Sequence, residues 1–420
     1  MLNHIPNYRR SSNQITREAA SERLGIPQNL FVPPHRPVHP VGDVTTKELT
    51  IATTVLRNTG RDKPADGALR DELRRQRGLP PQSSTAVAQG IFAYHRWLGW
   101  IDKTAPLTVS IVRALEMQGT FNRNPAHFTD ADLRAHAIPA WAQDAMEVTA
   151  DWCRALQAEP RLWLRARKGR GDALAQQLWD SRVAFPADAP EAIEFRGKED
   201  LFRSELFHAG EFEVQDLNSQ MVGLLCAPQP GETWWDACAG EGGKLLHLSD
   251  LMQNKGLLWA SDRAEWRLKR LKLRAGRAKA FNYRSVLWDG GAKLPTKTKF
   301  DGVLVDAPCS GVGTWQRNPH SRWTTTPDDV RELGAVQLKL LRHVAPSVKP
   351  GGRLIYSVCT LTRAETTAVT EAFAKDFPSF QPLPLPNPFD PSQEYSPEIR
   401  LRPEATGGNG MFIAAWRRTS

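Results

Sequence analysis

The sequence predicts an α/β protein in which a helical region precedes a C-terminal domain built on a parallel sheet. From about residue 212 onward, short and continuously apolar runs alternate with helical stretches, which is typical of buried parallel strands joined by helices. A glycine-rich turn follows the first of these runs, 233–236. In such sheets ligands bind beyond the carboxyl ends of the strands, so we expect the functional site at that edge.

Composition and pattern divide the chain into four parts. Residues 1–42 are rich in proline, asparagine, serine and arginine, and we expect an irregular extension there. A helical domain over 43–158 and a small α/β connector over 159–208 follow, and the sheet domain occupies 209–420. A chain of 420 residues has room for two or three domains and at least one large core.

Helical periodicity defines the second part of the chain. One predicted helix carries apolar residues on a single face, at Val87, Ile91, Tyr94, Leu98 and Ile101. A second helix is predicted over 141–156, where Pro139 stands at the start. We interpret these apolar and tryptophan-rich faces as core rather than as cofactor contacts. In the connector the pattern predicts a strand, a helix over 171–182 and a strand over 192–196.

The sheet domain is predicted from its alternating elements. The strands are expected over 233–236, 256–262, 300–306 and 353–358. The helices between them are expected over 245–254, 265–275 and 331–344. Asp236, Asp262 and Asp306 each fall at the carboxyl end of a predicted strand, so we expect these three acids at one edge of the sheet.

Cysteine usage and hydropathy limit the class of protein. The five cysteines are widely spread and include no Cys-x-x-Cys pair, which argues against a disulfide framework and against a structural metal site. Residues 1–40 contain no apolar stretch of signal-peptide length, and nowhere do about 18 uncharged apolar residues follow one another. We therefore expect a soluble, cytoplasmic protein without a metal.

The positive charge of the chain favours a polyanionic partner. The formal net charge is +9 and the sequence pI is about 9.4. Cations are dense over 161–170, where they alternate with apolar residues, and again over 263–279. These segments could be a strand surface and a solvated helix face, or they could neutralise RNA phosphates, since phosphate contact requires little more than cations. The sequence leaves both interpretations open.

The glycine-rich turn predicts a site for a nucleoside ligand. It consists of Cys238, Ala239, Gly240, Glu241, Gly242, Gly243 and Lys244. The turn lacks dinucleotide spacing, and Leu245 stands where a P-loop would have the Ser or Thr that holds magnesium. Small residues let a ligand approach the backbone, and the following helix N-terminus suits a carboxylate. Because Asp262 could accept hydrogen bonds from a ribose, S-adenosylmethionine and NAD are both compatible with these residues.

Two cysteines follow predicted strands at the same edge. Cys309 lies in the segment 306–311, and Cys359 lies in 357–360. An isolated buried cysteine is usually inert filler, because only a lowered thiol pKa makes it reactive. These two are expected to meet beside the glycine-rich turn, and we therefore consider them candidate nucleophiles.

These motifs, in this order, resemble the RNA 5-methylcytosine methyltransferases of the NOL1/NOP2/Sun family. The similarity runs from residue 207 to residue 418 and is greatest to bacterial 16S ribosomal RNA cytosine-C5 methyltransferases with an N-terminal helical domain. The similar segments are 210–220, 238–244, 306–311 and 410–415, together with Asp262, Asp289, Cys359 and Glu365. The resemblance implies a Rossmann-like S-adenosylmethionine-dependent methyltransferase domain preceded by the helical domain and the connector.

The resemblance also implies a role for each residue. The turn 238–244 would wrap S-adenosylmethionine, Asp262 would hold its ribose, and Asp289 would lie near its adenine. Asp306 would lie between the cofactor and the target base. Cys359 would be the nucleophile that adds to cytosine C6, and Cys309 would assist elimination of the enzyme after methyl transfer.

The covalent route has a chemical reason. Cytosine C5 is a poor nucleophile until a thiolate adds to C6, so covalent catalysis divides one difficult step into easier ones. The base must be unpaired or flipped to reach the thiol, which favours loops of folded RNA. Ribosomal RNA is the expected partner. The same chemistry on tRNA, and a non-catalytic RNA-binding or ribosome-assembly role, stay open as alternatives.

Overall fold

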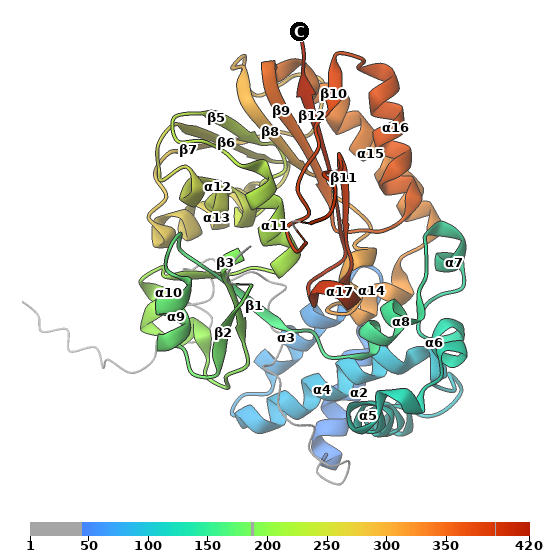
Figure 1. The fold of residues 1–420 in the computed structure, drawn as a ribbon. Helices are drawn as coiled ribbons and strands as arrows, with labels where there is room; N and C mark the ends of the chain where they lie inside the picture. Colours follow the sequence, from blue (N-terminus) through green and yellow to red (C-terminus); the bar gives the residue numbers. More distant parts are fainter. Residues whose placement is uncertain (1–43, 186–188, 391) are drawn as a thin grey trace, which may run out of the picture.

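The computed structural model describes residues 44–185, 189–390 and 392–420. It consists of a helical domain, a connector and a sheet domain, coloured blue to cyan, green, and green to red in Figure 1. The predicted extension over 1–42 lies outside the described residues. Within the described ranges no helix combines the length and the apolar character needed to cross a membrane.

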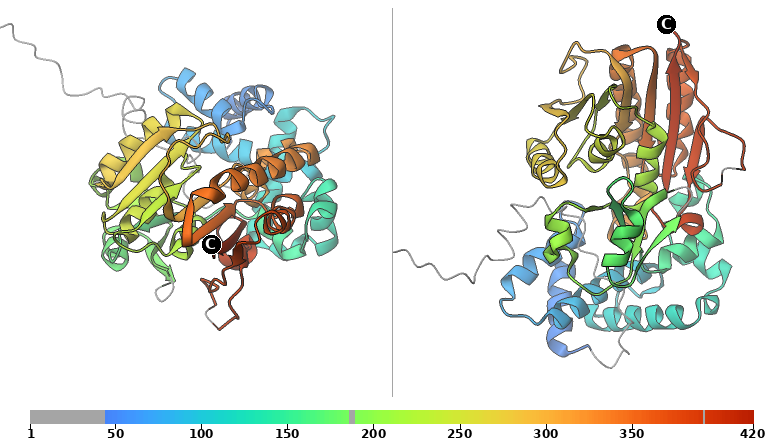
Figure 2. Two further views of the ribbon diagram at one scale, coloured as in Figure 1. Left: turned by 90° about the horizontal axis from the view of Figure 1, so that it is seen from above. Right: turned by 60° about the vertical axis from the view of Figure 1, so that its left-hand side comes forward.

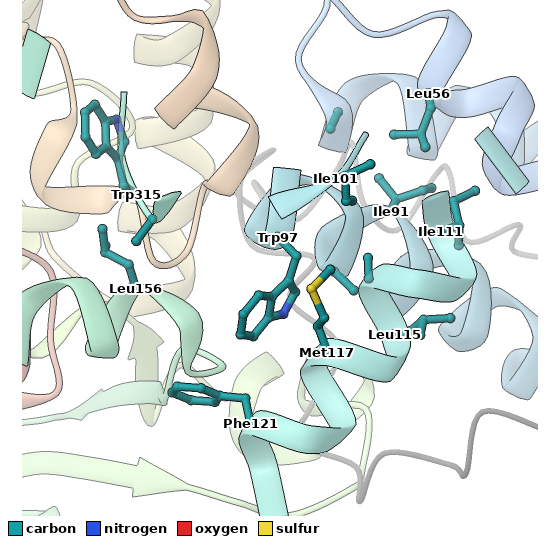
Figure 3. Close-up of a cluster of buried hydrophobic side chains, with 14 of the residues drawn as sticks. Leu56, Ile91, Trp97, Ile101, Ile111, Leu115, Met117, Phe121, Leu156 and Trp315 are labelled. Carbon is teal, nitrogen blue, oxygen red and sulfur yellow. The ribbon is translucent and has the colours of Figure 1, made fainter. Parts of the chain in front are cut away.

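The helical domain packs its helices around an aromatic and aliphatic core. Its helices are α2 (Thr46–Arg57), α3 (Ala65–Arg75), α4 (Pro81–Trp97), α5 (Leu107–Arg123), α6 (Asp130–His136), α7 (Trp141–Ala145) and α8 (Ala150–Gln157). Trp97 on α4 is fully buried and faces Met117 and Phe121 of α5 across this core (Figure 3). As predicted, Val87 and Ile91 are buried on one face of α4.

The prediction of a single helix over 141–156 is wrong, because the chain is extended between α7 and α8. Met146 has extended backbone angles and ends α7. Thr149 then caps the N-terminus of α8, where its side chain accepts a hydrogen bond from the backbone N–H of Trp152 at 3.1 Å. A threonine N-cap begins a new helix rather than continuing an old one, and that signal was present in the sequence.

The connector is an antiparallel sheet with one short helix. Its elements are β1 (Leu162–Ala166), α9 (Gly171–Gln177), β2 (Ser181–Phe185), β3 (Ala189–Phe195) and β4 (Phe212–Val214), in the sheet order β2-β3-β1-β4. The predicted helix therefore ends at 177 rather than 182, and a strand follows it directly. Because β4 pairs with β1, the connector sheet also takes in residues beyond the boundary predicted at 208.

The sheet domain has the strand order β10-β12-β9-β8-β5-β6-β7, and β11 pairs with β12. The strands are β5 (Thr233–Asp236), β6 (Leu257–Asp262), β7 (Tyr283–Leu287), β8 (Phe300–Asp306), β9 (Val348–Val358), β10 (Phe380–Pro382), β11 (Glu398–Leu401) and β12 (Met411–Arg418). The strands β5 to β9 are mutually parallel, as predicted, whereas β12 runs antiparallel to β9.

Helices cover both faces of this sheet, which confirms the predicted architecture (Figures 1 and 2). On one face α11 (Leu217–Cys226), α12 (Gly243–Leu251) and α13 (Glu265–Ala278) pack on the strand residue Trp234. On the other face α15 (Pro327–Val344) and α16 (Thr367–Asp376) pack with its neighbour Trp235. Successive strand residues point to opposite faces, so a strand buried on both sides is apolar throughout.

A segment of the sheet domain inserts into the helical domain. Val312, three residues after Cys309, and Trp315 are fully buried members of the helical core. Figure 3 shows Trp315 beside Leu156 of α8. The short helix α14 (Pro319–Thr324) follows, and its Arg322 is buried and donates to the carbonyl oxygens of Ala137 and Leu156, both at 2.9 Å.

Candidate active site

Two adjacent parallel strands bring the predicted thiols together. β8 and β9 pair in a register that sets Asp306 opposite Ser357. Beyond the strand ends, Gly313 N–H donates to the Cys359 carbonyl at 3.0 Å, which holds the two following loops side by side. The Sγ atoms of Cys309 and Cys359 lie 3.1 Å apart, and both residues are half-buried.

The two thiols have opposite acidities. The hydrogen bond from Cys309 lowers the pKa of Cys359, against the opposing effects of burial and Asp306, and Lys244 adds to the lowering. The pKa of Cys309 is raised well above its usual value, chiefly because it shares that hydrogen bond, and also by burial. Cys359 is therefore the more acidic thiol of the pair, and Cys309 is the one that holds its proton more tightly. A thiolate is the reactive form of cysteine.

The other cysteines match the inert class. Burial raises the pKa of Cys153 to about 11, and it raises the pKa of Cys226 further. Cys238, in the glycine-rich turn, also has a pKa well above the usual value because it is buried near Asp236. Of the five cysteines, all within the described ranges, Cys359 alone has a lowered pKa.

Asp306 is held between a lysine and a serine next to the thiols. Lys244 Nζ lies 2.7 Å from one carboxylate oxygen, and Ser357 Oγ donates to the other at 2.8 Å. Burial opposes the charged form of Lys244, but the Asp306 carboxylate outweighs burial and raises the pKa of the lysine above its usual value. The last residue of the glycine-rich turn is thus joined to the cysteine edge by an ion pair.

The glycine-rich turn has the open backbone that a close ligand requires. Gly240 and Gly242 have φ values of +54° and +88°, which glycine adopts without strain. A Cβ on Gly242 would lie 2.8 Å from Leu271 Cγ of α13. Asp262 fixes the turn to β6, because its carboxylate accepts from Gly240 N–H at 3.0 Å and from Ala264 N–H at 2.8 Å. Its remaining lone pairs are the ones available to a ligand.

Glu241 and Asp289 have no described contact with the two thiols or with Asp306. Glu241 forms an ion pair with Arg270 of α13, with 3.1 Å between Oε1 and Nη1. Asp289 is exposed two residues after β7, the edge strand beside β6, and accepts a hydrogen bond from Gly291 N–H at 2.8 Å. The structure therefore unites Asp262, Asp306, Lys244 and the thiols, while the described contacts of Asp289 are local.

Asp236 is a candidate site residue to which the sequence analysis assigned no role. It is 1 % exposed, and its Oδ1 has no hydrogen-bond partner among the described residues. Burial raises its pKa to about 8, with a further contribution from the Asp306 charge. At neutral pH this carboxyl is therefore largely protonated. Its position directly before the turn was the signal available in the sequence.

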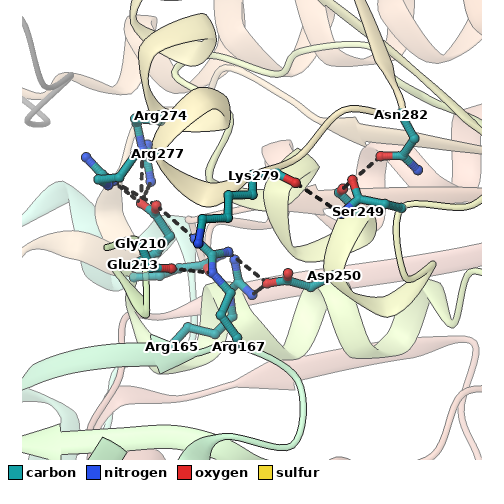
Figure 4. A network of polar contacts seen from close by, with 12 residues as sticks. Arg165, Arg167, Gly210, Glu213, Ser249, Asp250, Arg274, Arg277, Lys279 and Asn282 are labelled. Atoms are coloured by element: carbon teal, nitrogen blue, oxygen red, sulfur yellow. Dashed lines mark hydrogen bonds and ion pairs between the residues drawn. The ribbon is translucent and has the colours of Figure 1, made fainter. Parts of the chain in front are cut away.

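Two cations of the segment 161–170, for which RNA contact was one of the two open interpretations, instead form ion pairs within the protein (Figure 4). Arg165 Nη1 lies 2.6 Å from Asp250 Oδ2 of α12, and Arg167 Nη1 lies 2.9 Å from the same oxygen. Arg167 also lies within 3.5 Å of Glu213 on β4. The phosphate role is therefore wrong for these two residues. Lys168 and Arg170, which follow them, are exposed.

The fold is of the S-adenosylmethionine-dependent methyltransferase class. Its Rossmann-like sheet carries the glycine-rich turn after β5 and acids at the ends of the neighbouring strands β6 and β8. Residues 223–417 match the family described as 16S rRNA methyltransferase RsmB/F. The match lies within the domain that carries the predicted motifs, and it confirms the resemblance inferred from them.

Curated relatives carry the corresponding names. The chain is 32 % identical over 292 residues to the "Probable ribosomal RNA small subunit methyltransferase B" of Bacillus subtilis, covering 67 % of this chain and 65 % of that protein. It is 35 % identical over 266 residues to the protein of the same name from Synechocystis sp., covering 60 % and 59 %. The match thus spans less than two thirds of either relative.

Two solved structures share the fold. The crystal structure of PH0851 superposes with a TM-score of 0.72 at 23 % identity, covering 91 % of this chain and 100 % of that one. NSun6 from Pyrococcus horikoshii, solved with SFG, has a TM-score of 0.55 at 18 % identity and covers 64 % and 94 %.

Proposed function

We propose that this protein transfers a methyl group from S-adenosylmethionine to C5 of a cytosine in RNA, with ribosomal RNA as the expected substrate, through a covalent Cys359–C6 adduct. The observation that carries the proposal is the pair of thiols 3.1 Å apart, of which one has a lowered and one a raised pKa. Methyl transfer to an amine would need neither thiol. The RsmB/F family and the two methyltransferase B relatives support RNA as the substrate.

The residues present fit S-adenosylmethionine. Nothing lies within 4 Å of the position that a Cβ on Gly240 would take, so a ligand can approach the backbone there, and the Asp262 carboxylate beside it suits a ribose. The unpartnered Oδ1 of Asp236 faces no protein donor among the described residues. The solved neighbour with SFG, an S-adenosylmethionine analogue, supports the same assignment. When bound, the cofactor supplies the methyl group.

The chain's own residues would act in sequence. The Cys359 thiolate adds to C6 and makes C5 nucleophilic enough to accept the methyl group. Asp306 hydrogen-bonds the Watson–Crick edge at N3 or N4 and stabilises the adduct, while Lys244 and Ser357 fix the orientation of its carboxylate. Once Cys359 is bonded to C6, its hydrogen bond and charge no longer raise the pKa of Cys309, which can then lose its proton to solvent. Cys309 accepts the C5 proton, the C5–C6 double bond reforms, and the Cys359–C6 bond breaks to release the Cys359 thiolate.

Replacing each thiol separately tests this mechanism. We expect Cys359→Ser to lower the rate of methyl transfer by on the order of a thousandfold or more, with no protein–RNA adduct. We expect Cys309→Ser to methylate the base and then remain bonded to the RNA. A denaturing gel with unmethylated 16S ribosomal RNA and labelled cofactor would show a slow covalent band for Cys309→Ser only.

Cys153→Ala, in the helical core, is the matched control and should retain methyl transfer and turnover. A covalent band for Cys359→Ser instead would exchange the two roles. Full activity in both serine variants would show that the covalent mechanism is wrong. RNA binding by the wild type without any methyl transfer would favour the assembly role, and methylation of tRNA alone would replace ribosomal RNA as substrate.

A further inference from the structure

Glu365 is a buried carboxylate with an unusually complete set of donors. It is 0 % exposed in a short 3-10 turn, Arg363–Glu365. Its Oε1 accepts from Ser310 N–H at 2.8 Å and from Gln337 Nε2 at 3.0 Å. Its Oε2 accepts from three hydroxyls, those of Ser310 at 2.5 Å, Thr362 at 2.9 Å and Thr360 at 3.0 Å. Burying a carboxylate is costly unless its lone pairs are satisfied, as they are here.

The donors are the immediate neighbours of the two thiols. Ser310 follows Cys309, and Thr360 follows Cys359, so one carboxylate binds both cysteine loops. The hydroxyls of Ser310 and Thr360 also lie 3.1 Å from each other. Any displacement of the Glu365 carboxyl would therefore move the two loops relative to one another.

A second pair of side chains fixes the carboxylate itself. Gln337 on α15 donates to Glu365 and also to the Pro308 carbonyl at 2.9 Å, so it holds the chain just before Cys309. Tyr356 on β9 donates to Gln337 Oε1 at 2.9 Å and to the Glu365 carbonyl at 2.7 Å. Pro308 and Ser310 are thus held on both sides of Cys309 by one buried network.

The charge of Glu365 acts on the same thiols. It contributes to the raised pKa of Cys309, after the hydrogen bond to Cys359, burial and the Cys359 charge. A negative charge behind Cys309 favours the proton on that sulfur, which leaves Cys359 as the more acidic thiol. Position and charge therefore favour the same division of roles.

We propose that Glu365 is the positioning residue of the active site, which holds the Cys309 and Cys359 loops at the separation that lets both sulfurs act on one cytosine ring. The inference rests on the proposed cytosine chemistry, because that reaction requires the two sulfur atoms to lie close together. Atoms C5 and C6 are bonded neighbours, so a displacement of about 1 Å in either sulfur could cost on the order of a hundredfold in rate.

The separation of the thiols can be measured without RNA. Phenylarsine oxide condenses with two neighbouring thiols to form two As–S bonds and one water, and a single thiol does not hold it stably. We expect the wild type to bind one arsenical per chain by intact mass, and Cys309→Ser to bind none stably. Glu365→Gln should slow this capture about tenfold or more, because an amide cannot accept from all five donors.

The kinetic readout separates positioning from binding. Glu365→Gln should lower kcat for methyl transfer about a hundredfold and leave KM for RNA within about twofold. Glu371→Gln, an exposed residue on α16, makes the same charge change nearby and should alter neither measurement. If Glu365→Gln does not fold, as judged by circular dichroism, Ser310→Ala replaces it, because that variant removes one hydroxyl donor and keeps the backbone donor.

Slower capture together with a lower kcat would support the positioning role. Wild-type capture by folded Glu365→Gln, or by Ser310→Ala where the first variant fails to fold, would overturn it, as would slower capture with an unchanged kcat. If the wild-type protein methylates no cytosine, the proposed function fails. The capture rates alone would then decide whether Glu365 holds the thiols together.

Discussion

The sheet domain is attached to its two neighbours by interfaces of opposite chemistry. Toward the connector, carboxylates lie between guanidinium groups, as the buried Glu213 and the partly exposed Asp250 do in Figure 4. Toward the helical domain, the buried cation Arg322 is surrounded by backbone carbonyls, and Trp315 enters an apolar core. The first interface depends on charge and the second on shape, so different changes should break each of them.

Glu213 is the centre of the connector interface. Its carboxylate is bound by Arg274 at 2.8 Å and by Arg277 at 2.7 Å, both from α13, and Arg167 lies at 3.5 Å. Burial by itself would raise the pKa of Glu213, but these three cations outweigh burial and lower it to about 2. Charge pairing at this site therefore joins β1, β4 and α13.

Arg322 is the corresponding residue of the helical interface, and it forms no ion pair with a carboxylate of the described ranges. It donates to the carbonyls of Arg96 and Trp315 at 3.3 Å, in addition to its two shorter bonds. Burial lowers its pKa to about 9, and Arg96 adds to the lowering. Because Val312 begins this interface three residues after Cys309, the shape of the helical core also supports the active-site loop.

The largest effect is expected from Glu213→Gln. This change removes the buried negative charge that Arg274, Arg277 and Arg167 share, and breaking such a pair costs about 3–5 kcal/mol of unfolding free energy. Urea unfolding would measure the loss. Glu211→Gln, a neighbouring residue whose nearest cation is Arg170 at 3.9 Å, should change stability by less than about 0.5 kcal/mol. Equal effects in both variants would show that the connector interface does not depend on charge.

Trp315→Leu should cause the next largest loss of unfolding free energy. This variant tests the helical interface, which depends on shape. The smaller side chain leaves a cavity beside Leu156, which we expect to cost about 2–3 kcal/mol of unfolding free energy. Trp179→Leu provides the control, because Trp179 is 78 % exposed and its loss should be nearly neutral. Restoration of Trp315→Leu stability by a small apolar ligand that fills the cavity would confirm the cause, and a loss below about 0.5 kcal/mol would refute it.

Acid should weaken the connector interface through protonation of Glu213. Glu213 has a native pKa near 2 and an ordinary value of 4.5, so its stabilisation is complete above pH 4.5 and is lost as the pH falls toward 2. From about pH 5 to about pH 3 the wild type should lose about 2 kcal/mol more than Glu213→Gln. The stability difference between wild type and Trp315→Leu should stay constant over that range. A constant difference for Glu213→Gln as well would contradict the assigned pKa.

The sequence could predict the features of the site that depend on local motifs, but not those that depend on contacts between distant segments. The glycine turn, its strand-end acids and both cysteines lie in short motifs directly after strands, so strand order alone brought them together. The role of Arg165 stayed open because its partner Asp250 is 85 residues away, and a pattern of alternating cations is the same whether the cations bind phosphate or carboxylate. The Glu365 network and the insertion of Trp315 likewise depend on contacts between segments that no local pattern relates.

The smallest effect is expected at the surface of the connector. Lys168 is exposed directly after Arg165 and Arg167, whose guanidinium groups are held in ion pairs, so its ammonium group can contact phosphate. Lys168→Ala should reduce the slope of log affinity for RNA against log salt by about 1, since one counterion fewer is released. Lys375→Ala, an exposed residue on α16, should leave the slope unchanged. Arg165→Met should lower the unfolding free energy without changing the slope. A flatter slope in that variant would show that Arg165 contacts RNA phosphate after all.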